Sequence, residues 1–145
     1  MADMSSSSTT IDAPVDDVRA VLFDIQAYPT WSSSFKSVEI LEKDASGRPT
    51  KLTIKVEAGV LKDRATLTFD WSKAPGQLSF SLDEADLMTE MQGHFETQDN
   101  GDDTTTVKYQ LTVALSMPVP AMMRQKAERA TIDLALSQLK TKLEG

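Results

Sequence analysis

The 145-residue sequence contains no cysteine and a single histidine, His94. Without thiols the chain forms no disulfide, offers no thiol nucleophile and cannot bind zinc through cysteine. One histidine beside Glu90 does not supply the three protein ligands of a catalytic zinc site. The six glycines form neither a P-loop nor a dinucleotide-binding pattern, and Ser32, Ser33 and Ser34 have no base nearby in the sequence. The sequence therefore predicts no metal and no cofactor.

Basic residues and long apolar runs are also scarce. The chain has 15 Lys and Arg against 22 Asp and Glu, a net charge of −7, which argues against nucleic acid and anionic membranes as partners. No apolar run approaches the ~18 residues of a membrane span, and residues 1–5 lack the basic and apolar regions of a signal peptide. We expect a cytoplasmic protein with one domain over residues 1–145, of which residues 1–4 are disordered.

Alternation of apolar and polar residues dominates the middle of the chain. It is typical of strands that have one dry and one wet face. The hairpins between them are short, as in the turn at residues 99–102, so the strands should form an antiparallel meander. Residues 5–11 suit an edge strand. The predicted alternating strands span residues 38–43, 52–58, 61–71, 78–83, 87–96 and 107–117.

A short helix is predicted after the first strand. Asp12 is a plausible N-cap, and Pro14 fits the first turn, where its missing N–H costs nothing. Asp16 and Asp17 favour the positive end of the helix dipole. The apolar positions that follow repeat at helical spacing, and the helix should end before Tyr28-Pro29. Residues 28–34 then form a turn or a one-turn helix.

A long amphipathic helix is predicted from Val119 or Pro120 to about Leu143. At ~24 residues it is ~36 Å long, enough to cross a sheet. One apolar stripe follows its first half and, after a small shift along the sequence, a second stripe follows its second half. The first stripe is Met123, Ala127, Ala130 and Leu134, and the second is Ile132, Leu136, Leu139 and Leu143.

Four segments carry a resemblance to a known family. They are Ile11-Asp12-Ala13-Pro14 with Val15 and Val18, Tyr28-Pro29-Thr30-Trp31, Gly93-His94-Phe95, and the hairpin over residues 100–107. With this order of elements, residues 5–143 resemble small bacterial members of the START-like superfamily, also called the helix-grip or polyketide cyclase/dehydrase and lipid transport group. The resemblance implies an α+β helix-grip fold. About seven antiparallel strands would wrap around the long C-terminal helix, and two short helices would follow the first strand.

The same resemblance implies a cavity between the sheet and the last helix, because such domains include lipid and sterol carriers. Small alanines on the inner face of the helix would leave room for a ligand, although they could equally permit close packing of a solid core. Apolar pockets with a few polar groups are the usual small-molecule sites. The predicted cavity residues are Ile54, Val56, Leu67, Phe69, Phe80, Met91, Phe95, Tyr109, Leu111, Met123, Ala127 and Ala130.

Two polar residues share the phase of this apolar set. Asp63 is either a buried site residue or a solvated residue at a strand end. The Tyr109 hydroxyl either anchors a ligand oxygen or caps the edge of the core. His94 falls on the predicted wet face. Met117, Met122 and Met123, at the junction of strand and helix, either line a gate or fill gaps in the core.

These features favour a non-enzymatic function. The leading hypothesis is binding or transport of a small hydrophobic molecule such as a lipid, a quinone or a polyketide-like aromatic. One alternative is a polyketide cyclase or dehydratase that orients a flexible chain and uses Asp63 and Tyr109 for proton transfer. Another is a protein-interaction module that docks through the junction at Met117–Met123. The chain is expected to be a monomer or a homodimer.

Overall fold

The computed structural model describes residues 5–58, 61–116 and 119–144. Within these ranges the predicted seven strands, two short helices after the first strand and long final helix are confirmed. The elements are β1 (Ser5–Ile11), α1 (Val15–Phe23), the 3-10 helix η1 (Ile25–Thr30), β2 (Phe35–Lys43), β3 (Pro49–Ala58), β4 (Leu61–Asp70), β5 (Gln77–Ala85), β6 (Met88–Asp99), β7 (Thr105–Leu115) and α2 (Ala121–Glu144).

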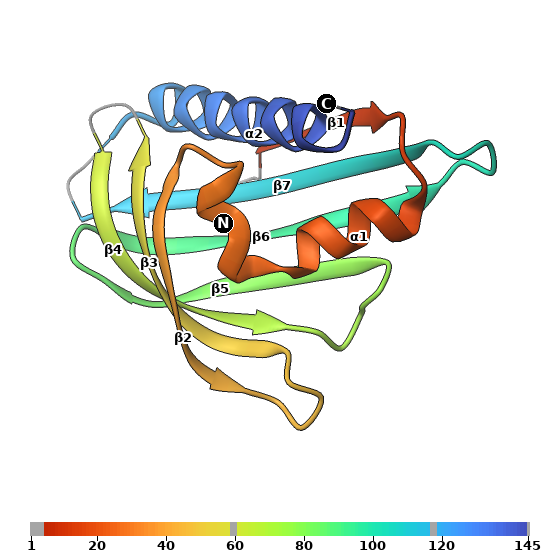
Figure 1. Ribbon diagram of the computed structural model, residues 1–145. Helices are drawn as coiled ribbons and strands as arrows, with labels where there is room; N and C mark the ends of the chain where they lie inside the picture. Colours follow the sequence, from red (N-terminus) through yellow and green to blue (C-terminus); the bar gives the residue numbers. More distant parts are fainter. Residues whose placement is uncertain (1–4, 59–60, 117–118, 145) are drawn as a thin grey trace.

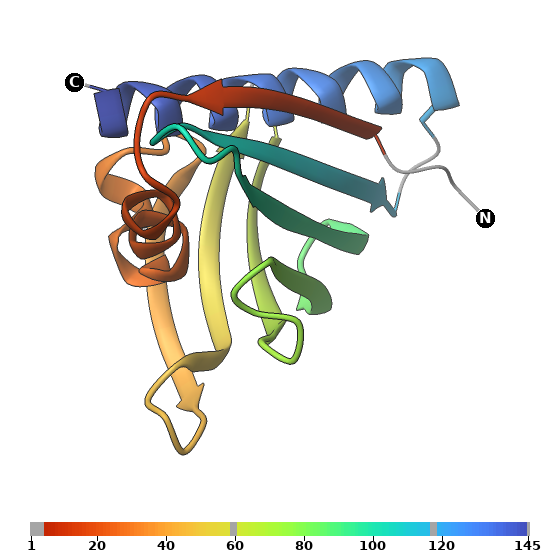
Figure 2. The ribbon, with the colours of Figure 1, turned by 90° about the vertical axis from the view of Figure 1, so that its right-hand side faces the viewer.

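The strands form one antiparallel sheet in the order β1-β7-β6-β5-β4-β3-β2 (Figure 1). Strands β2 to β7 follow one another as the predicted meander, and β1 joins the sheet beside β7. Helix α2 packs chiefly against β1 and β7, while the sheet curls away beneath it (Figure 2). Helix η1 packs against β2, and α1 packs against β6. The two short helices therefore lie between the edge strand β2 and the middle of the curved sheet. The concave face of the sheet is therefore enclosed by helices.

The start of α1 differs from the prediction. The helix begins at Val15, and Pro14 occupies the N-cap position with φ −62° and ψ 150°, a conformation that proline adopts without strain. Asp12 does not cap the helix; its backbone N–H donates to Glu144 Oε2 at 2.8 Å. Asp16 and Asp17 do lie in the first turn, where they stabilise the helix dipole as predicted.

Strand β6 contains an irregularity that the alternation does not predict. The register between β6 and β7 shifts between Met88 and Glu90. The extra residue turns Met88 into the core, although its sequence position places it on the wet face. Leu87, expected on the dry face, is exposed. A β-bulge of this kind reverses the facing of the residues before it.

Gly93 lies where β6 passes beneath an aromatic ring. It is opposite Phe80 of β5 and Leu111 of β7. A Cβ at this position would collide with the Gln110 carbonyl oxygen and approach the Phe80 ring to 3.0 Å. Glycine is required here by the close approach of two neighbours, not by an unusual backbone angle.

We expect Gly93→Ala to lower the free energy of unfolding by about 1–3 kcal/mol, because the added methyl must displace backbone or the Phe80 ring. The matched control is Gly76→Ala, since a Cβ at Gly76 meets nothing within 4 Å. Urea unfolding of both variants measures the difference. Equal stability of the two variants would contradict this account of Gly93.

Candidate functional site

The concave face of the sheet is lined by apolar side chains from β3 to β7. All nine predicted cavity residues on the strands point to this face, as the alternation predicts. Eight of them are buried in one apolar cluster, and Val56 packs partly buried against it. The eight are Ile54, Leu67, Phe69, Phe80, Met91, Phe95, Tyr109 and Leu111.

The three predicted cavity residues on α2 are placed elsewhere, and this prediction is wrong. Met123 is 63% exposed, and Ala127 and Ala130 are also exposed. The second apolar stripe of the sequence sets the rotation of the helix instead. Its buried residues are Ile132, Leu136 and Leu139. Because they lie on the opposite side of the helix from the first stripe, burying one stripe exposes the other.

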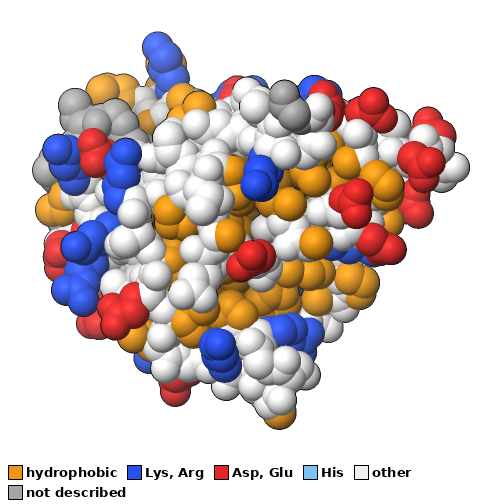
Figure 3. Space-filling view, viewed as in Figure 1, with side chains coloured by type: hydrophobic (Ala, Val, Ile, Leu, Met, Phe, Trp, Pro, Cys, Tyr) orange, Lys and Arg blue, Asp and Glu red, His pale blue; other side chains and the backbone are white. Residues whose placement is uncertain are grey.

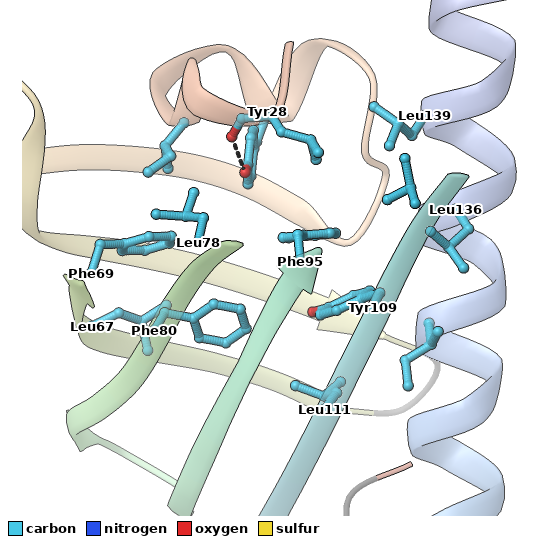
Figure 4. Packing of buried hydrophobic residues seen from close by; sticks show 14 of the residues in the cluster. Tyr28, Leu67, Phe69, Leu78, Phe80, Phe95, Tyr109, Leu111, Leu136 and Leu139 are labelled. Atoms are coloured by element: carbon cyan, nitrogen blue, oxygen red, sulfur yellow. Dashed lines mark hydrogen bonds between the residues drawn. The ribbon is translucent and has the colours of Figure 1, made fainter. Parts of the chain in front are cut away.

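Four aromatic rings form a continuous row across the concave face. Phe69 contacts Phe80 with ring centroids 5.5 Å apart, and Phe80 contacts Tyr109 at 6.5 Å. Phe95 stacks on Tyr109 at 4.2 Å with planes inclined by 21°. Figure 4 shows these rings between the strands and the buried leucines of α2. Such rings present flat apolar surfaces suited to an aromatic or polyene ligand.

Tyr109 places a hydroxyl within this apolar surface. The residue is 4% exposed, and its hydroxyl points toward the interior beside Phe80 (Figure 4). Among the described residues this hydroxyl takes part in no hydrogen bond, whereas the Tyr28 hydroxyl donates to the Leu22 carbonyl. Burial raises the pKa of Tyr109 well above its usual value, so the phenol stays protonated at neutral pH and can act as a donor.

Asp63 has a structural role that neither sequence hypothesis anticipated. The residue is buried, and its carboxylate accepts hydrogen bonds from the backbone N–H groups of residues 86, 87 and 88 at 2.9–3.2 Å. It also accepts from the backbone N–H of Arg64 at 2.8 Å. The carboxylate thus fixes the connection from β5 to β6, and its oxygens are occupied. A role in proton transfer has no support in this arrangement.

Glu128 is a buried polar residue that the sequence analysis missed. It is 3% exposed and faces the sheet from α2. Its carboxylate accepts from the Ser5 hydroxyl, the Arg124 guanidinium and the Val113 backbone N–H. The described pairing of β1 with β7 ends at Ser5, opposite Leu111. Beyond it, the backbone N–H of Val113 on β7 donates to Glu128 instead of to a strand. An (i, i+4) spacing of Arg124 and Glu128 was the available signal.

Two surface clefts lie outside the aromatic row. One, of about 480 Å³, lies along the free edge of β2 beside Gln26, Val38 and Ile40. Val38 and Ile40 pair with Ile54 and Leu52 and so share the concave face. The other cleft, of about 470 Å³, is on the convex face and has charged walls that include Arg64 and Glu84. The predicted cavity beneath α2 remains a prediction.

The remaining candidates lie outside the concave cluster. His94 is on the outer face of β6 with Nε2 3.3 Å from Glu96 Oε1, in agreement with its predicted facing. Met122 is 81% exposed, as Met123 largely is, so these two methionines do not fill the core. Met117 lies outside the described residues. Within those residues no helix is long and apolar enough to span a membrane.

The comparison with protein families matches this architecture. Residues 11–140 match the family described as polyketide cyclase/dehydrase and lipid transport. The chain therefore belongs to that family, which confirms the resemblance derived from the sequence. A search of curated proteins gave no significant match.

Solved structures agree with the fold over almost the whole chain. A START superfamily protein from Mycobacterium smegmatis is 26% identical, with a TM-score of 0.92 and 97% of each chain covered. A protein from Thermus thermophilus is 18% identical, with a TM-score of 0.82, covering 98% of this chain and 97% of the other. The Zhui aromatase/cyclase from a Streptomyces species is 16% identical, with a TM-score of 0.80, covering 99% and 94%. The last two likenesses concern the fold alone.

We expect Asp63→Asn to lower the free energy of unfolding by about 2 kcal/mol, because an amide cannot accept from all the N–H groups that the carboxylate satisfies. Asp86→Asn is the matched control on the same connection, since the Asp86 side chain is exposed; it should change stability by less than ~0.5 kcal/mol. Thermal unfolding by circular dichroism measures both. A fully stable Asp63→Asn variant would show that these hydrogen bonds contribute little.

Proposed function

We propose that the protein binds a small hydrophobic molecule against the concave face of its sheet, with the Tyr109 phenol donating a hydrogen bond to an oxygen of the ligand. The observation that carries this proposal is the Tyr109 hydroxyl, which lies in an apolar surface and has no hydrogen-bond partner among the described residues. A hydrogen bond to a hydroxyl among apolar side chains is favourable. A ligand oxygen would supply that bond, while the aromatic row would contact the apolar part of the ligand.

The family supports the same function, because its description includes lipid transport. The cleft between η1 and the free edge of β2 supplies a route by which a ligand could approach the concave face. Apolar side chains gather across the middle of the face that contains β2 and α1, with both basic and acidic side chains around them (Figure 3). Ligand sites are usually apolar surfaces of this kind with few polar groups.

The carboxylates near the concave face favour binding over catalysis. Asp63 and Glu128 are both buried, and each already accepts hydrogen bonds from backbone N–H groups. Neither is free to remove a proton from a substrate without losing those bonds. Tyr109 then serves as a neutral donor, which suits a carbonyl, quinone or carboxylic acid oxygen.

Tyr109→Phe tests the proposal together with its control Tyr28→Phe. The Tyr109 variant should keep its stability, because the hydroxyl has no described protein partner, but should bind the ligand about 3- to 10-fold more weakly. The Tyr28 variant should lose about 1 kcal/mol of stability with its bond to Leu22 and keep its affinity. Displacement of a fluorescent apolar probe by fatty acids, quinones and aromatic polyketides measures affinity.

Two results would contradict the proposal. One is that no compound of these classes displaces the probe from the wild-type protein. The other is that Tyr109→Phe binds the best displacing compound as tightly as the wild type does. Native mass spectrometry of the purified protein, followed by extraction of any bound molecule, identifies the ligand class independently of the chosen panel.

A second candidate function is cyclisation of a polyketide-like chain. It is favoured by the protonated Tyr109 phenol, which could donate to a carbonyl oxygen, and by the likeness in fold to an aromatase/cyclase. Incubation with a poly-β-ketone thioester distinguishes the two functions. A cyclase forms one ordered product that has lost water, faster than in buffer and more slowly with Tyr109→Phe. A binding protein leaves the product distribution and its rate unchanged.

A further inference from the structure

The first apolar stripe of helix α2 lies on the side of the helix away from the sheet. It consists of Met123, Ala127, Ala130 and Leu134, which are successively four, three and four residues apart. Met123 is 63% and Leu134 42% exposed, and the two alanines between them are exposed as well. We call these four residues the outer stripe. An outward face of a helix is normally polar, so this one calls for an explanation.

The spacing of the outer stripe is that of a coiled-coil seam. Alternating steps of four and three residues keep side chains in line along one side of a helix and allow them to interdigitate with a second helix. The two large residues lie at the ends and the two alanines at the centre. The small central alanines permit the backbones of two helices to approach closely at the point where they cross. Met123 and Leu134 then pack on either side of that point.

The outer stripe is complementary to itself. An antiparallel pair of α2 helices related by a two-fold axis between Glu128 and Arg129 places Met123 opposite Leu134 of the second copy. The same axis places Ala127 opposite Ala130. Every large side chain therefore meets a large one and every small side chain a small one, twice, as an isologous interface requires.

The charges beside the stripe fit the same arrangement. Lys126 and Asp133 are seven residues apart, so they border the stripe on one side. Both are exposed, and neither takes part in the ion pairs found among the described residues. In the antiparallel pair Lys126 faces Asp133 of the second copy across the axis. In a parallel pair, each residue would instead lie at the same height along the helix axis as its own counterpart, so Lys126 would be level with Lys126 and Asp133 with Asp133.

We propose that the outer stripe of α2 is a dimer interface with a second copy of this chain, packed antiparallel about a two-fold axis. The apolar residues of the outer stripe alone could pack against any apolar helix. In the same register, however, Lys126 pairs with Asp133 of the second copy, and this charge pairing favours a second copy of this chain as the partner. Four layers of side chains are fewer than a standard interface of about 1,600 Å² contains. The dimer should therefore be weak and depend on concentration. This proposal does not depend on the proposed function, since the outer stripe and the concave face lie on opposite sides of α2.

Charge exchange tests the interface. We expect sedimentation velocity of the wild-type chain to show a reversible monomer–dimer equilibrium. Lys126→Asp alone and Asp133→Lys alone each create two repulsive pairs and should weaken dimerisation about tenfold. A mixture of the two single variants restores both attractive pairs, so a heterodimer should form with near wild-type affinity. The double variant should also form a homodimer of near wild-type affinity. Circular dichroism should be unchanged in all of these exposed variants.

The orientation is tested with single cysteines, since the natural chain has none. Ala127→Cys and Ala130→Cys are mixed and oxidised. The antiparallel arrangement predicts that the mixture forms mainly the disulfide-linked heterodimer, because residue 127 faces residue 130 of the other copy. A parallel arrangement would instead link each variant to itself.

Three results would overturn the proposal. The first is a wild-type chain that stays monomeric over the whole accessible concentration range, which would leave the stripe to a different protein. The second is failure of the mixed charge variants to recover dimerisation. The third is disulfide formation mainly within each single cysteine variant.

Discussion

The rotation of α2 about its own axis is the constraint on which the other features depend. It is set by burial of Ile132, Leu136 and Leu139 against the sheet, each of which contributes roughly 1.5–3 kcal/mol by leaving water. With these residues inside, helical geometry places Glu128 inside and the outer stripe outside. The same rotation thus determines the buried polar contact with β7, the apolar lining beneath the helix and the exposure of the outer stripe.

The concave face combines a row of aromatic rings with the Tyr109 hydroxyl, which makes no hydrogen bond to any of the residues that the structure describes. Most buried hydroxyls find a partner within the protein, and Tyr28 on the neighbouring helix does so through the Leu22 carbonyl. Tyr109 differs because it points into apolar surroundings from the middle of β7. The contrast between two buried tyrosines in one core is the reason why we propose a ligand as the partner of the Tyr109 hydroxyl.

Much of the fold follows from local pattern in the sequence. The alternation of the strands correctly predicts that Ile54, Leu67, Phe80 and Leu111 face inward. Side chains alternate between the two faces of a strand, whichever strands lie beside it. The sequence predicts helix α2 itself but not which of its sides faces the sheet. Its sequence contains two apolar stripes, and local pattern cannot decide which one the sheet covers.

The functional details depend on contacts between distant segments, which explains why the sequence did not predict them. Glu128 is acceptable inside because the Val113 N–H lies there to be bonded. Asp63 receives its donors from a connection more than twenty residues away. The facing of Met88 depends on a bulge in the pairing with β7. In each case a buried polar group or a shift in register departs from the simple alternation of apolar and polar residues.

The most direct test of the central claim is a crystal structure of the protein with the compound that best displaces the apolar probe. The account predicts that the compound lies between the concave face and α2, with one of its oxygens about 2.6–3.0 Å from the Tyr109 hydroxyl. A compound bound on the convex face, or one beneath α2 that leaves this hydroxyl without a partner, would contradict the account.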